Sequence, residues 1–144
     1  MSAQSILKKK IDDLISLMLT DGVQPSDLAD NIFFDSYVKV SYIKINDEVI
    51  GELVFVEESD SLQNAITLRY FYDLSRKVVR IEEENYNCKK IVWDRNHQEA
   101  QMINEIIDMM NELYLPEQIK KFISTLPEEL KLKINKASAE KRAS

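Results

Sequence analysis

The chain has 144 residues, of which 44% are hydrophobic and 31% charged, a composition that is ordinary for one globular domain and excludes intrinsic disorder. A single cysteine, Cys88, excludes an intramolecular disulfide, and two glycines, Gly22 and Gly51, are too few for a glycine-rich phosphate-binding loop. The net charge of −6 is uneven, because residues 1–117 carry 12 Lys+Arg against 22 Asp+Glu and residues 118–144 carry 7 against 3. An acidic body disfavours nucleic-acid binding except through this basic tail.

The first predicted element is a helix of about four turns near the N-terminus. Its apolar residues recur at helical spacing on one stripe: Leu7, Ile11, Leu14, Ile15 and Met18. Ser2 or Ser5 is expected to cap its start, and Gly22 to end it in a left-handed turn. A single helical turn is then predicted at residues 25–27, because Pro25 suits the first helical position.

From Tyr37 the apolar period changes from helical to alternating, which predicts strands. Residues 46 and 47, Asn-Asp, are expected to form a tight turn into a second strand over residues 49–56. The polar stretch 57–64 indicates a loop, and strands are expected again over residues 66–72, 77–83 and 89–93. Connections this short require antiparallel pairing, so the strands form a meander.

The helical period resumes from His97 to Tyr114, and Pro116 and Pro127 each favour the start of a further helix. We therefore predict an α+β fold with an N-terminal helix, an antiparallel meander of about five strands, and two or three C-terminal helices. Residues 1–126 are expected to form a single α+β domain, and residues 127–144 a basic C-terminal tail that is helical or frayed. This order of elements resembles the architecture of dimeric chaperones that hold secretion clients, without a shared motif.

Two groups of residues raise the question of catalysis. Asp94, His97 and Glu99 form a short acidic and histidine cluster of a kind that ligates metals or exchanges protons, but helix capping and an exposed first turn account for the same pattern. A dyad of Cys88 with His97 requires the fold to bring the two together.

The second group is acidic. Carboxylates gather in two runs (Glu57, Glu58 and Asp60; Glu82, Glu83 and Glu84), and a nuclease-like set can be drawn from Asp73, Lys77, Glu83 and Lys90. Solvated turns and strand faces explain these charges equally well. We therefore assign no catalytic residue, no metal ligand and no cofactor.

Apolar residues on both faces of the predicted sheet favour a covered second face, either by the chain's own helices or by a partner. The residues predicted to bind a partner are Tyr70, Tyr72, Trp93, Met102 and Met109.

The leading hypothesis is a non-catalytic protein-interaction module (an adaptor, chaperone-like holder or inhibitor) that binds a protein partner or itself as a homodimer. The alternatives are a small metal-dependent enzyme that uses acidic residues and the single histidine, and a nucleic-acid-associated regulator that acts through the basic tail. No signal-peptide pattern and no apolar run of membrane-spanning length occur, so we expect a cytoplasmic protein without a membrane partner.

Overall fold

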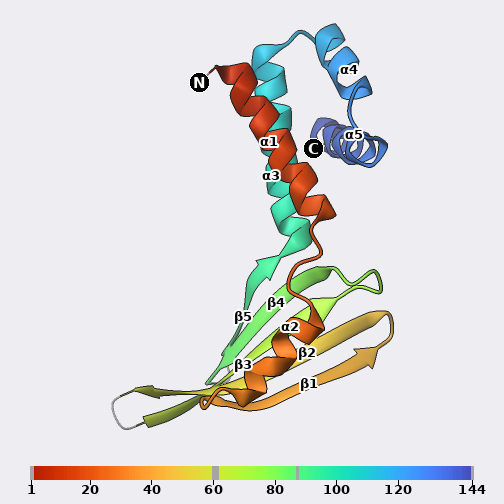
Figure 1. Cartoon of the computed structure of the whole chain (residues 1–144). Helices are drawn as coiled ribbons and strands as arrows, with labels where there is room; N and C mark the ends of the chain where they lie inside the picture. The colour runs from red at the N-terminus through yellow and green to blue at the C-terminus, as the bar shows by residue number, and fades with distance from the viewer. Residues whose placement is uncertain (1, 60–61, 87, 144) are drawn as a thin grey trace. The chain divides into compact units, whose positions relative to one another are not determined.

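A computed structural model describes residues 2–59, 62–86 and 88–143. It confirms the α+β fold, in which an N-terminal helix precedes a five-stranded antiparallel sheet and C-terminal helices follow (Figure 1). The contacts divide the chain into a helical unit, residues 1–19 with 97–144, and a sheet unit, residues 20–96. Within the described ranges, no helix is both long and apolar enough to cross a membrane.

The helical unit is built on the predicted stripe of α1 (Ala3–Leu19). Ser2 caps this helix, since its Oγ accepts a hydrogen bond from the backbone N–H of Ser5 at 3.1 Å. Four stripe residues are buried against side chains of α3 (Arg95–Leu113) and α5 (Glu128–Ala143): Leu7, Ile11, Leu14 and Met18. An ion pair of 2.9 Å between Lys10 and Glu105 also joins α1 to α3.

The C-terminal segment, for which the sequence left helix or frayed tail open, forms α5. Leu130 and Ile134 on this helix are both 0% exposed and belong to the same apolar core as α1 and α3. Between α3 and α5 lies α4 (Pro116–Ser124), which begins with its proline at the predicted position. The core of the helical unit therefore draws on the last 17 residues of the sequence as well as on its first 19.

The sheet unit is a meander in the order β1-β2-β3-β4-β5. Its strands are β1 (Tyr37–Ile45), β2 (Glu48–Ser59), β3 (Leu62–Tyr72), β4 (Val78–Asn85) and β5 (Cys88–Asp94). The turn predicted between the first two strands is confirmed, with Asn46 at φ 55°. Every strand therefore pairs with its sequence neighbour, and β1 and β5 are the edges.

The predicted loop at residues 57–64 is wrong at both of its ends. Glu57 pairs with Asn64, and the pairing of β2 with β3 continues to Ser59 and Leu62. The backbone makes these ladder bonds whatever the side chains are, so a polar composition does not end a long hairpin. Asp60 lies outside the described residues.

One face of the sheet is covered by α2 (Pro25–Ala29), and we call it the α2 face. Tyr42 donates its hydroxyl hydrogen to the carbonyl of Pro25 at 2.6 Å, and Tyr72 donates to the carbonyl of Val23 at 2.8 Å. Buried apolar residues from α2 and from this face form the small core of the unit: Leu28, Leu53, Ile66 and Tyr72. A short 3-10 helix, η1 (Asp30–Phe33), connects α2 to β1.

Candidate interaction surfaces

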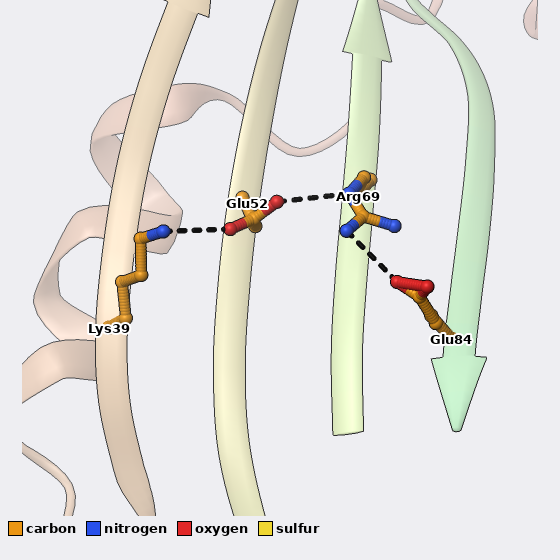
Figure 2. Close-up of polar contacts among 4 residues, drawn as sticks. All are labelled: Lys39, Glu52, Arg69 and Glu84. Atoms are coloured by element: carbon orange, nitrogen blue, oxygen red, sulfur yellow. Dashed lines mark hydrogen bonds and ion pairs between the residues drawn. The ribbon is translucent and has the colours of Figure 1, made fainter. Parts of the chain in front are cut away.

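The opposite side of the sheet, which we call the charged face, carries a row of alternating charges across four strands (Figure 2). Lys39 on β1 and Arg69 on β3 each approach a carboxylate oxygen of Glu52 on β2 at 3.0 Å. Arg69 also reaches Glu84 on β4 at 3.1 Å. Two cations meet two carboxylates, so the row neutralises itself.

The pKa values of this row reflect its hydrogen bonds. The bond from Lys39, joined by that from Arg69, holds the pKa of Glu52 below its ordinary value despite partial burial. Burial alone would lower the pKa of Arg69, but its bonds to Glu52 and Glu84 outweigh that effect and raise it. Both shifts favour the charged forms, and the ion pairs join four neighbouring strands, as opposite charges on one face of a sheet do when they stabilise strand pairing.

The acidic run at the end of β4 is divided between the two faces. Glu82 pairs with Arg80 at 2.6 Å on the charged face, where Arg80 also lies 3.8 Å above the ring of Phe71. Glu83 points to the α2 face and pairs with Lys90 at 3.1 Å. Neighbouring strand residues alternate in direction, so the three carboxylates of this run do not converge.

The nuclease-like set is also not assembled. Asp73 lies in the turn after β3, where its Oδ1 accepts bonds from the backbone N–H groups of Ser75 and Lys77 at 2.9 and 3.0 Å. Burial acts to raise the pKa of Asp73, but a hydrogen bond from the Ser75 hydroxyl at 2.7 Å and the two backbone bonds outweigh it, so the pKa is lowered. Glu83 lies opposite Leu68, five residues along β3 from Asp73, which is about 16 Å of strand.

The predicted cluster of Asp94, His97 and Glu99 is not arranged as a metal site either. His97 is exposed, whereas Glu99 is buried and forms an ion pair of 3.4 Å with Lys133 of α5. Asp94 ends β5 and Cys88 begins it, so this strand holds them about 20 Å apart. Within the described parts of the chain, no group of three or more His, Cys, Asp and Glu side chains is placed to hold a metal ion.

The residues predicted to bind a partner lie in three different settings. Tyr72 is 2% exposed, and burial raises the pKa of its hydroxyl. Tyr70 and Trp93 are half-buried in one cross-strand row on the α2 face, joined through Ile81. Half-buried Met102 and Met109 pack against the core of the helical unit. Tyr70 and Trp93 therefore share a partly exposed row of the sheet unit, whereas Met102 and Met109 belong to the helical unit.

A group of exposed apolar side chains lies instead at the edge of the sheet formed by β1, and it includes Phe33, the most exposed large apolar residue among those described. Phe33 and Phe34 are 83% and 61% exposed, Val38 at the start of β1 is 60% exposed, and Ile32 lies beside them in the sequence. We call these four residues the edge patch. The sequence signal for this patch is an aromatic pair between a short helical turn and an alternating strand, and it was not among the residues predicted to bind a partner.

Comparison with protein-family models, with curated proteins and with solved structures finds no match for this chain.

Proposed function

We propose that this chain is a non-catalytic protein-interaction module whose sheet binds an extended segment of a partner protein along β1. The observation that carries the proposal is the edge patch beside β1, a strand of nine residues whose outer side pairs with none of the described strands. Apolar side chains gain free energy when a partner removes them from water, and an open strand edge supplies backbone partners for an added strand.

The register identifies the backbone groups that would bind. Ile45 and Glu48 flank the two-residue turn and form a hydrogen-bonded pair, so alternate residues of β1 direct their N–H and C=O groups toward β2. The backbone groups of Val40, Tyr42 and Lys44 then point away from the sheet. Among the described strands, none pairs on that side. These groups match the spacing of an incoming strand.

The composition of β1 favours a different protein over a second copy as the occupant. Its nine residues include Lys39 and Lys44 but no carboxylate. Pairing two copies along β1 would place Lys44 of both copies along one seam with no acidic residue of β1 to oppose them, while Lys39 is already paired with Glu52 of its own chain. A partner segment that combines apolar and acidic residues would complement both the edge patch and the lysines of β1 better than a second copy would.

The test uses a photo-crosslinking residue in place of Phe33 in the full chain, expressed in its native cells. Tyr86 is the matched control position, because it is also an exposed aromatic, 72% accessible, at the β4–β5 turn. We expect one heterologous product from position 33 and none from position 86. Products of twice the mass of 16.8 kDa, or equal yields from both positions, would contradict the proposal.

The purified crosslinked partner then provides a quantitative test. Phe33→Ser with Phe34→Ser should weaken its binding by on the order of tenfold or more, whereas Tyr86→Ser should not. Amide exchange should slow at Val40 and Tyr42 in the complex. Binding without slower exchange at these two residues would show that the partner contacts another surface and would contradict the proposal.

A further inference from the structure

The helical unit has an amphipathic helix whose apolar side is only partly covered. Ile119, Phe122 and Ile123 lie on one side of α4, and the ring of Phe122 stacks on Tyr114 at 5.9 Å between centroids. None of the described residues of α4 is fully buried, whereas α5 buries Leu130 and Ile134 completely. Part of the apolar side of α4 is therefore left for another contact.

A groove of about 600 Å³ runs beside this side of α4, between α3 and α5. Its floor is apolar and consists of Ile107, Met110, Ile119 and Ile123. The floor residues of α3 are themselves core residues, so the groove opens onto the core of the helical unit rather than onto a loose surface. A volume of this size accommodates several side chains of a binding partner.

The rim of the groove carries an excess of positive charge. Lys120, Lys141 and Arg142 line it against one carboxylate, Glu117, while Asp108 next to it pairs with Lys141. The helical unit as a whole is neutral, with 10 Lys+Arg and 10 Asp+Glu in residues 1–19 and 97–144. The basic rim is therefore a local concentration of charge at the groove and not a property of the whole unit.

We infer that this groove binds an acidic amphipathic helix of a partner protein, with apolar side chains on the floor and carboxylates at the rim. A free anion would gain nothing from the apolar floor, and a helix presents a row of apolar residues at every third or fourth position with acidic residues beside it. This site lies in the helical unit and does not rest on the proposed role of β1.

The test measures fluorescence anisotropy of a labelled peptide of about 15 residues with leucines on one helical stripe and glutamates elsewhere. A second peptide has lysines in place of the glutamates. We expect the full chain to bind the acidic peptide, more weakly as salt is raised, and not the basic one. No binding of the acidic peptide, or equal binding of both, overturns the inference.

A pair of charge-reversal variants locates the binding. Lys120→Glu with Arg142→Glu should weaken the acidic peptide about tenfold and create binding of the basic peptide, a gain that misfolding cannot produce. Lys8→Glu with Lys136→Glu makes the same change of charge at exposed positions of the same unit outside the groove, and should alter neither affinity. Equal effects of the two variants would show attraction to the net charge alone and overturn the inference. Binding of anionic lipid vesicles that is lost only in the first variant, without peptide binding, would assign the groove to a membrane surface instead.

Discussion

The ring of Tyr42 lies directly over the backbone of Gly51 on the neighbouring strand. A Cβ atom added to Gly51 would come within 2.7 Å of Cε1 of Tyr42, although the backbone of this glycine needs no left-handed conformation. The two residues are paired in the register, and the tyrosine hydroxyl is fixed by the carbonyl of Pro25. Glycine is therefore required here for space, since the ring occupies the site of a side chain.

Gly51→Ala should consequently force Tyr42 off α2. We expect a loss of about 1–3 kcal/mol in the free energy of unfolding, as in other overpacked sites. Urea unfolding followed by the single tryptophan, Trp93 on β5, measures it in the sheet unit. The same substitution in a Tyr42→Ala background should cost much less, and equal costs in the two backgrounds would refute the steric explanation.

Arg95 also contributes to the stability of the sheet unit. Its buried guanidinium donates to the carbonyls of Val78 at 2.7 Å and Thr20 at 2.9 Å, which joins the segment after α1 to the start of β4. Arg95→Met leaves these carbonyls without their charged donor, and we expect a loss of about 3 kcal/mol. Arg76→Met, at an exposed arginine of the same unit, should change the urea midpoint little. Similar losses in the two variants would show that only charge matters.

The row on the charged face should make stability depend on acid. Because the pKa of Glu52 is lower in the folded chain than the value of about 4.3 in an unfolded one, the unfolded chain binds the proton more readily. The contribution of Glu52 is then complete above the unfolded pKa and is lost as the pH falls through the folded pKa.

Urea unfolding between neutral pH and the acid limb tests this directly. Glu52→Gln should flatten the loss of stability below the unfolded pKa, and Lys39→Met, which removes the first hydrogen-bond donor to Glu52, should move the acid transition to higher pH. An unchanged acid slope in Glu52→Gln would mean that other groups control it.

Much of the fold was predictable because the spacing of apolar residues along the sequence differs between helices and strands. The stripe that begins at Leu7 follows from one buried helix face, and Asn46 adopts the left-handed conformation that a tight turn needs. The alternation that begins at Tyr37 predicted β1 correctly, although this strand has no fully buried residue. The length of the β2–β3 hairpin was not predictable in this way, because backbone pairing extends it to Ser59 and Leu62 through a polar stretch that has no alternating apolar pattern.

The candidate surfaces were less predictable because side-chain type does not decide exposure. Tyr72 and Phe33 are both aromatic residues next to turns, yet Tyr72 is 2% exposed and bonded to the segment before α2, whereas Phe33 is 83% exposed. Irregularities in pairing at Phe71/Tyr72 and Ile81/Glu82 also shift the phase of alternation, so the direction of a residue beyond them cannot be counted from the first strand.

The last helix offers a test of what the C-terminal residues do for stability. Leu130 is fully buried between α1 and α3 side chains, so Leu130→Ala should destabilise the helical unit by about 2–5 kcal/mol. Leu132→Ala, at a leucine that is 61% exposed on the same helix, should cost less than about 0.5 kcal/mol. Thermal unfolding followed by far-ultraviolet circular dichroism measures both, and equal effects would place α5 outside the core.

Deleting residues 127–144 would remove Leu130 and Ile134 together, so any nucleic-acid binding lost on deletion would also reflect an opened core. Reversal of the exposed Lys136, which leaves the core intact, is the sharper test of a charge-mediated role for this segment.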